Sequence, residues 1–179
     1  RFFLGGQAGG GVLSLGQRGG APRRGGAPPM KSKSEVPAMP FRPYRHKAQY
    51  YETDTMKIVH HSNYIRWMEE ARVDMLEQMG LGYDVMERAG ILSPVLSVSA
   101  QYKSMTRFPE TVEISVRLVR YTGVRFELSY EMRDAATGTL RCLGESSHCF
   151  IDGSGAPVSL RRKFPAWDEL FRRYAEESR

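Results

Sequence analysis

The chain is poor in cysteine and lacks any long apolar run. Cys142 and Cys149 are its only cysteines, and because they lie an odd number of residues apart in one strand-like run, their side chains should point to opposite faces. A disulfide between them is therefore not expected. The chain has no stretch of about 18 consecutive apolar residues and no secretory signal. We accordingly expect a cytoplasmic protein that does not bind a membrane.

A concentrated positive charge is also absent from most of the chain. The formal net charge is +6, but residues 1–40 contribute +5 of it, from six Arg or Lys and one Glu. The remaining residues are nearly neutral, so they lack the basic footprint that phosphate-backbone binding requires. Nucleic acid is therefore not an expected partner.

Residues 1–40 also differ in composition, because they hold ten of the eighteen Gly and five of the ten Pro. Such a segment buries too little apolar surface to offset the entropy of ordering it. We expect a disordered tail or, since the chain begins with Arg, non-native upstream sequence with Met30 or Met39 as the true start. A transit peptide would be Ser-rich and amphipathic, and this stretch is neither. The predicted folded domain spans residues 41–179.

Hydrophobic periodicity predicts an α+β domain. A period of 3.6 residues, in a wide apolar arc after the N-cap candidates Ser62 and Asn63, indicates a largely enclosed helix, and a period of two indicates strands. The expected elements are strand 44–52, helix 64–79, short helix 83–89, strands 96–102, 112–118, 124–132 and 140–151, and an amphipathic helix from Pro165. We interpret the four later strands as an antiparallel meander wrapped around one central helix.

The loop of residues 52–61 contains the side chains best suited to chemistry. It places Asp54, His60 and His61 just before a helix N-terminus, whose free N–H groups suit a developing oxyanion. A carboxylate nearby can act as general base on water or as nucleophile on a carbonyl carbon. Judged from the residues alone, Asp54 is more often a turn former that bonds its own backbone. Because no further ligand stands at a recognisable spacing, we predict no metal site.

Residues 50–80 resemble the 4-hydroxybenzoyl-CoA thioesterase-like branch of the hot-dog superfamily, in the run YYETDTMKIVHHSNYIRWMEEARVDMLEQMG. The elements TD, IV, HSNY, RW and EAR fall in that family's order and spacing. The later segments YKSMTRFPETVEI and HCFIDGSGAPVSL resemble its strands and turns. The resemblance implies a hot-dog fold, a homodimer or homotetramer with sites at subunit interfaces, and an acyl-CoA hydrolase without a cofactor.

The resemblance also implies a role for each matching position. Asp54 would attack the thioester carbonyl or activate water, and the backbone N–H of His61 would polarise that carbonyl. The His61 side chain would hold Asp54 or the carbonyl in place. The expected substrate contacts are His60, Asn63 and Tyr64, with Lys103 and Arg107 facing the coenzyme A phosphates.

Residue 57 departs from the family pattern, which commonly has Gly where this chain has Lys57. We expect a Lys there to need ordinary backbone angles. The loop would then differ in detail, or the ammonium would lie near the Asp54 carboxylate and hold it ionised.

Three alternatives stay open. The first alternative is a hot-dog dehydratase, which needs an acid on the buried side of the central helix. The thioesterase branch that draws its carboxylate from this helix has the same requirement. Glu70 instead falls in the polar arc of the helix, where it would form an ordinary i,i+4 pair with Arg66. A thioesterase acting on acyl carrier protein would need a basic landing surface, which the near-neutral domain does not display. A non-catalytic acyl-thioester-binding module would have no use for Asp54, since a buried carboxylate costs stability unless it is paired or used.

Overall fold

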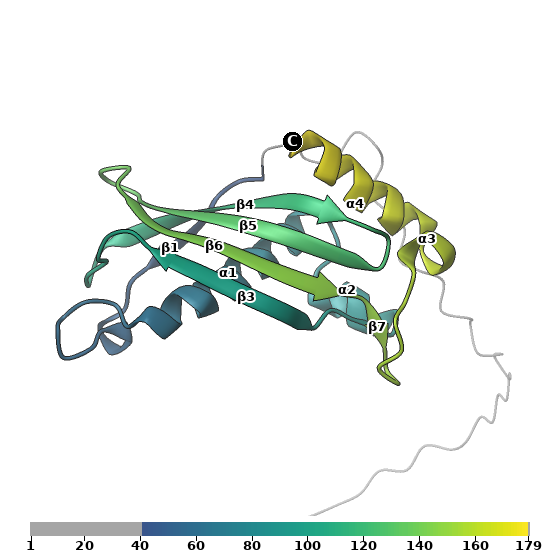
Figure 1. Ribbon diagram of the computed structural model, residues 1–179, viewed down its shortest axis with the longest axis horizontal. Coiled ribbons are helices and arrows are strands. Elements are labelled where there is room, and N and C mark those ends of the chain that lie inside the picture. Colours follow the sequence, from purple (N-terminus) through teal and green to yellow (C-terminus); the bar gives the residue numbers. More distant parts are fainter. Residues whose placement is uncertain (1–40, 179) are drawn as a thin grey trace, which may run out of the picture.

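The computed structural model describes residues 41–178, so the expected tail, residues 1–40, lies outside the described residues. The elements follow one another along the chain as an α+β arrangement (Figure 1). They are β1 (Tyr44–Lys47), the 3₁₀ turn η2 (Tyr50–Glu52), α1 (His61–Gln78), α2 (Tyr83–Arg88), β2 (Ile91–Leu92), β3 (Val95–Tyr102), β4 (Thr111–Tyr121), β5 (Arg125–Asp134), β6 (Leu140–Cys149), β7 (Ile151–Asp152), α3 (Leu160–Lys163) and α4 (Pro165–Glu177).

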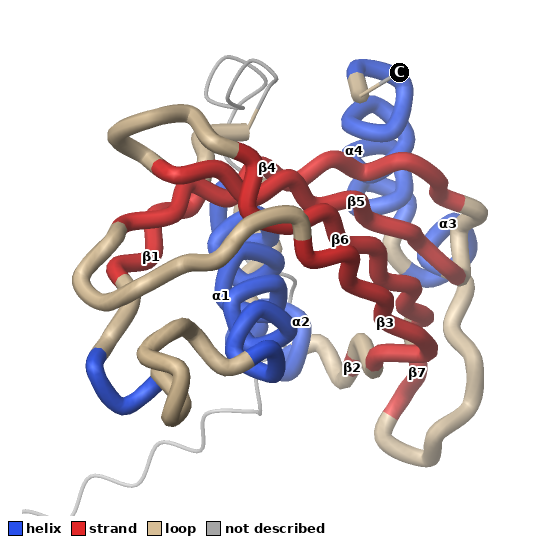
Figure 2. Tube along the Cα trace, turned by 60° about the vertical axis from the view of Figure 1, so that its left-hand side comes forward, coloured by secondary structure: helices blue, strands red, loops and turns tan. Residues whose placement is uncertain are grey.

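The main sheet has five antiparallel strands in the order β1-β4-β5-β6-β3, and α1 lies against one of its faces (Figure 2). The predicted meander is correct for β4, β5 and β6 but wrong for β3, which pairs with β6 and forms an edge. The segment after β3 bonds to β6, because the Lys103 and Ser104 amides both donate to the carbonyl of Arg141. Consecutive strands need not pair when the connection between them is this long.

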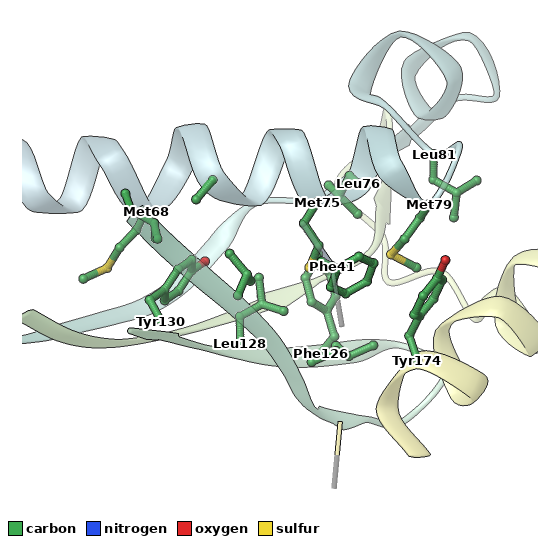
Figure 3. Packing of buried hydrophobic residues seen from close by; sticks show 14 of the residues in the cluster. Phe41, Met68, Met75, Leu76, Met79, Leu81, Phe126, Leu128, Tyr130 and Tyr174 are labelled. Carbon is green, nitrogen blue, oxygen red and sulfur yellow. The ribbon is translucent and has the colours of Figure 1, made fainter. Parts of the chain in front are cut away.

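The core lies between α1 and the sheet (Figure 3). Met68 and Met75 of α1 point toward Leu128, Phe126 and Tyr130 of β5, and all five are almost fully buried. Burying one such side chain contributes about 1.5–3 kcal/mol. The wide apolar arc predicted for the central helix is therefore the arc that packs on the sheet.

Several predicted boundaries are wrong by a few residues, and at three of them the structure shows the reason. The first strand ends at Lys47 because the chain turns at η2, where Glu52 accepts from the amide of Gln49. Helix α1 starts at His61, with His60 rather than Ser62 or Asn63 as its N-cap. The last strand ends at Cys149, because the next residues leave β5 and pair with β2 as β7.

The amphipathic C-terminal helix is confirmed as α4. Its predicted apolar face is buried, and Phe171 stacks on Tyr121 of β4 with ring centroids 5.1 Å apart. Among the helices of residues 41–178, none combines the length and apolarity needed to cross a membrane. Cys142 is buried, Cys149 is partly exposed, and both are free thiols.

Candidate active site

Asp54 lies in a tight turn between η2 and α1. Its amide donates to the carbonyl of Ile58 and its carbonyl accepts from the amide of Lys57, both at 2.9 Å. Its Oδ1 accepts from the amide of Met56 at 2.8 Å. The turn-forming interpretation is thus correct for one carboxylate oxygen, while no hydrogen bond within residues 41–178 reaches the other, Oδ2. The half-buried carboxylate has one oxygen fixed and one available for chemistry.

Lys57 closes this turn with a left-handed backbone, at φ 58°. The expectation of ordinary angles at this residue is wrong, because the hydrogen bond from the Lys57 amide to Asp54 requires the conformation that Gly adopts most easily. A side chain at such a φ costs about 1–2 kcal/mol. The chain therefore keeps the turn around Asp54 at the expense of local strain.

The N-terminus of α1 presents one available amide beside this turn. The Ser62 amide donates to Nδ1 of His60 and the Asn63 amide donates to the carbonyl of His60. Of the first three amides of α1, only that of His61 therefore keeps a free N–H, because an amide at a helix start has no intrahelical acceptor. A helix N-terminus with a free N–H stabilises developing negative charge.

A cavity of about 340 Å³ opens at this point. Its walls are mainly apolar, and the lining residues are Asp54, Met56, Ile58, Val59, His61, Tyr64, Tyr102, Lys103, Ser104 and Met105. Four of the predicted site residues, Asp54, His61, Tyr64 and Lys103, therefore come together.

Tyr102 is a cavity residue that sequence reasoning missed. Its hydroxyl donates to the carbonyl of His61 at 3.1 Å, and its ring packs edge-on against Tyr64 with centroids 5.2 Å apart. Burial raises the pKa of both tyrosines, so both hydroxyls stay neutral. The signal available in the sequence was the position of Tyr102 at a strand end directly before Lys103.

The other predicted substrate contacts do not line this cavity. His60 caps α1, with Nδ1 2.8 Å from Oγ of Ser62. Asn63 is buried and its Nδ2 donates to the carbonyl of Glu52 at 2.8 Å. Arg107 is exposed, and its guanidinium reaches Sδ of Met105 at 3.8 Å. His60 and Asn63 face the loop and the helix cap because the helix starts earlier than predicted.

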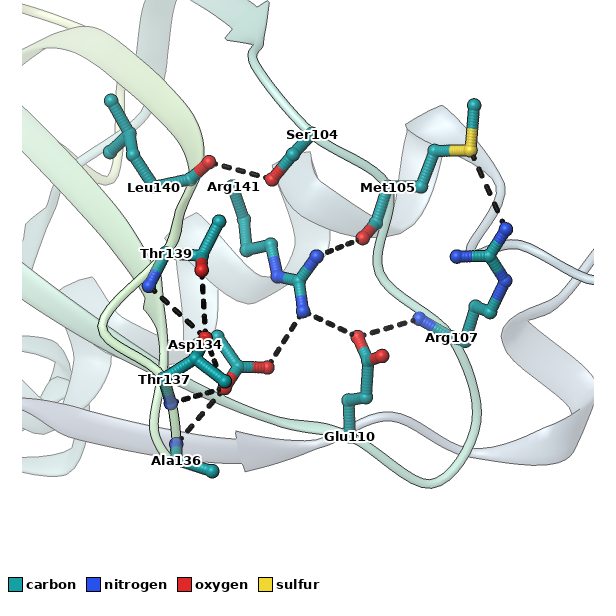
Figure 4. A network of polar contacts seen from close by, with 10 residues as sticks. All are labelled: Ser104, Met105, Arg107, Glu110, Asp134, Ala136, Thr137, Thr139, Leu140 and Arg141. Atoms are coloured by element: carbon teal, nitrogen blue, oxygen red, sulfur yellow. Dashed lines mark hydrogen bonds and ion pairs between the residues drawn. The ribbon is translucent and has the colours of Figure 1, made fainter.

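The cavity wall at Met105 is tied to the sheet by Arg141 of β6 (Figure 4). The guanidinium donates to the carbonyl of Met105, to Glu110 at 2.9 Å and to Asp134 at 2.7 Å. The hydrogen bond from Arg141, aided by the Thr137 amide, lowers the pKa of Asp134 to about 2. Asp134 therefore stays ionised at any ordinary pH and anchors the connection from β3 to β4.

The arrangement combines an available carboxylate oxygen, a free helix-terminal amide and apolar walls, which are the groups that acyl transfer requires. Glu70, the acid of α1 considered as an alternative, lies outside the cavity lining, as do the other acidic residues of this helix. No cluster of three or more His, Cys, Asp or Glu in residues 41–178 is placed to hold a metal ion.

Comparison with known proteins shows the family to which the chain belongs. The sequence profile of the thioesterase-like superfamily matches residues 49–172. YneP of Bacillus subtilis, named as an acyl-CoA thioesterase, is 34% identical over 126 residues, which cover 70% of this chain and 91% of that protein.

Solved structures agree. A DHNA-CoA thioesterase from Staphylococcus aureus superimposes with a TM-score of 0.70 at 32% identity, covering 74% of this chain and 89% of that one. A hypothetical protein from Aquifex aeolicus superimposes with a TM-score of 0.67 at 30% identity, covering 74% and 99%. The chain belongs to the thioesterase-like superfamily, and it is a thioester hydrolase with the hot-dog fold.

Proposed function

We propose that this enzyme hydrolyses acyl-CoA thioesters to a carboxylic acid and free coenzyme A. The observation that supports this most directly is that Asp54, with one carboxylate oxygen available, and His61, the first residue of α1, line the same cavity. The names of YneP and of the S. aureus structure, both of which specify CoA thioesters, agree with the substrate class.

The chemistry follows from these two groups. Asp54 either attacks the carbonyl carbon, forming an anhydride that water then cleaves, or takes a proton from the attacking water. The carbonyl oxygen gains negative charge in both routes, and the His61 amide donates to it. The carbon–sulfur bond breaks, and the thiolate of coenzyme A leaves and takes up a proton.

The walls of the cavity suit an acyl group. Met56, Ile58 and Met105 provide adaptable apolar surface, and the rings of Tyr64 and Tyr102 offer faces against which an aromatic acyl group can pack. Lys103, which donates to Gln101 at 3.0 Å, lies at the rim and is the proposed contact for a coenzyme A phosphate.

We also propose that two copies pair along β3. This strand is a sheet edge, and Leu96, Val98 and Tyr102 are 48%, 40% and 48% exposed. An exposed apolar edge strand is a template for pairing with another chain. Since β3 ends at Tyr102, a partner on this edge would border the cavity. Sedimentation analysis of Val98→Lys tests this, because the charge should shift the protein toward monomer and an unchanged mass would contradict it.

The cytoplasmic location remains part of the proposal. The two free thiols, Cys142 and Cys149, are compatible with a reducing compartment.

The first experiment compares wild type with Asp54→Asn in thiol release from short, medium, long and aromatic acyl-CoAs. Asn preserves the size and the hydrogen bond from Met56 but can neither attack nor accept a proton. We expect kcat to fall by about 10² to 10⁴, as loss of a general base or nucleophile requires. Equal rates would refute the role of Asp54. Turnover of acyl carrier protein thioesters, without turnover of acyl-CoAs, would refute the substrate class.

A further inference from the structure

Five side chains from β1, η2 and α1 form a polar cluster. We call this the His46 cluster, and its members are Tyr44, His46, Glu52, Trp67 and Glu70. The predicted pairing of Glu70 with Arg66 is wrong, because the Glu70 carboxylate instead accepts from the hydroxyl of Tyr44 at 3.1 Å and lies 2.9 Å from Nδ1 of His46. Strand β1 covers this side of α1, so the polar arc of the helix faces protein there.

Glu52 has the most hydrogen bonds in the His46 cluster. Its carboxylate accepts from the amide of Gln49 at 2.6 Å, from Nε1 of Trp67 at 2.8 Å and from Nε2 of His46 at 3.0 Å. Only 5% of the residue is exposed. Burial opposes ionisation, but these three hydrogen bonds together hold the pKa of Glu52 below its ordinary value. The buried carboxylate is therefore a permanent anionic anchor.

The main chain of Glu52 connects this anchor to both reacting groups. Its carbonyl accepts from the amide of His60 and from Nδ2 of Asn63, both at 2.8 Å. The turn that contains Asp54 starts two residues after Glu52, and the free amide of His61 follows directly after His60. Glu52 thus ties the start of the loop of residues 52–61 to its end. It thereby sets the separation between the Asp54 carboxylate and the His61 amide.

His46 joins the anchor to α1. Its ring, which stacks on Trp67 with centroids 4.5 Å apart, lies between two carboxylates, with Nε2 3.0 Å from Glu52 and Nδ1 2.9 Å from Glu70. A neutral imidazole donates from only one nitrogen, so both contacts are hydrogen bonds only when the ring carries two protons. In a neutral ring, one lone pair would face a carboxylate oxygen.

The charges that face His46 are the carboxylates of Glu52 and Glu70, and the hydroxyl of Tyr44 bonds the latter. Burial, together with the charges of Glu70 and the nearby Asp74, raises the pKa of Tyr44 to about 12, so that it remains a neutral donor. Asp74 is itself paired with Arg42 at 3.0 Å.

We propose that Glu52 and His46 are positioning residues for the thioesterase reaction, in which a doubly protonated His46 holds Glu52 and so sets the spacing between Asp54 and the His61 amide. This inference rests on the proposed function. A ring that bridges both carboxylates holds Glu52 against α1, and with it the loop that carries Asp54.

Glu52→Gln tests the anchor, because the carboxamide keeps the shape but turns its NH2 group toward at least one of the three donors. We expect kcat to fall about 10- to 100-fold, as a small misplacement of reacting groups causes. KM should change little, and the circular dichroism spectrum and the molecular mass should stay those of wild type. Glu113→Gln is the matched control, since it removes a carboxylate from the exposed pair with Arg45 on β1. Equal kcat in Glu52→Gln and in this control overturns the proposal.

Glu70→Gln tests the second proton. The introduced carboxamide can donate to Nδ1, so that a neutral His46 still donates from Nε2 to Glu52. We expect kcat in Glu70→Gln to stay close to the wild-type value, with a single proton on the His46 ring in nitrogen NMR. A kcat as low as that of Glu52→Gln, or a ring that keeps both protons in this variant, overturns the role of His46.

Two measurements decide the proposal without catalysis. Nitrogen NMR of His46 at pH 7 should show protons on both ring nitrogens, and hydrogen exchange in Glu52→Gln should accelerate at the amides of Lys57, Val59 and His60. A neutral ring together with unchanged exchange overturns the positioning role. If wild type cleaves no acyl-CoA but both measurements give the expected result, the proposed function fails while the loop anchor stands.

Discussion

Acid should destabilise this protein through His148, a buried histidine of β6. The side chain is 1% exposed, its Nε2 lies 2.7 Å from Oγ of Ser146, and its ring stacks on Phe126 at 4.7 Å. Burial, together with the charge of Arg72, lowers the pKa of His148 to about 3. The folded protein thus holds His148 neutral, whereas the unfolded chain binds a proton below about pH 6.5.

The sign and size of the effect follow from proton linkage. Because the unfolded state binds more protons between pH 6.5 and 3, the free energy of unfolding decreases as the pH falls through this window. With pKa values of 6.5 and about 3, the loss is about 2 kcal/mol by pH 5 and reaches an upper limit of about 5 kcal/mol near pH 3. Carboxylates with a lowered pKa, such as Glu52 and Asp134, begin to lose their stabilising contribution only as the pH falls toward their ordinary values of 4.5 and 3.8.

The assay is urea unfolding at pH 8, 6.5 and 5, followed by circular dichroism. His148→Asn removes the titrating ring, so it should be less stable than wild type at pH 8 but should lack the additional loss between pH 6.5 and 5. His60→Asn, at an exposed histidine, is the control and should keep the wild-type slope. If His148→Asn shows the same loss as wild type between pH 6.5 and 5, the reasoning is refuted.

Three further predictions concern the loop and the cavity wall. Lys57→Gly should raise the free energy of unfolding by about 0.5–1 kcal/mol, because relief of the strain at φ 58° outweighs the larger entropy that Gly loses on folding. A lower free energy of unfolding, measured with urea, would contradict this. Arg141→Met should cost about 2–4 kcal/mol, since it leaves Asp134 buried without its partner. The control Arg133→Met breaks the exposed pair with Glu131 and should lower the free energy of unfolding by only about 0–1 kcal/mol. Equal losses in the two variants would refute the greater importance of the buried pair. Tyr102→Phe should lower kcat/KM, because it removes the hydrogen bond from the Tyr102 hydroxyl to the carbonyl of His61, which is worth about 1 kcal/mol. An unchanged kcat/KM would show that this bond does not support the start of α1.

Local pattern was enough to find most of the elements. The period of 3.6 residues identified α1 and α4, and the period of two identified the strands, because each pattern reflects which side chains face the core. Boundaries were less accessible. The start of α1 at His61 depends on the imidazole of His60 capping the helix, and the end of β1 depends on Glu52 capping the turn at Gln49. Histidine is not a typical N-cap residue, and Gln49 stands where a capping box usually has Ser or Thr.

The sequence by itself determined the family, the loop with Asp54 and the approach of His61 to a helix N-terminus, because these features lie within a few residues of one another. Only the tertiary structure decided that β3 pairs with β6, that Tyr102 reaches the carbonyl of His61 from 41 residues away, and that His46 lies between Glu52 and Glu70. Such contacts join distant segments, and packing of the whole chain selects them. Lys57 shows the same limit in the backbone, since its left-handed conformation follows from the turn that holds Asp54 and not from any preference of lysine.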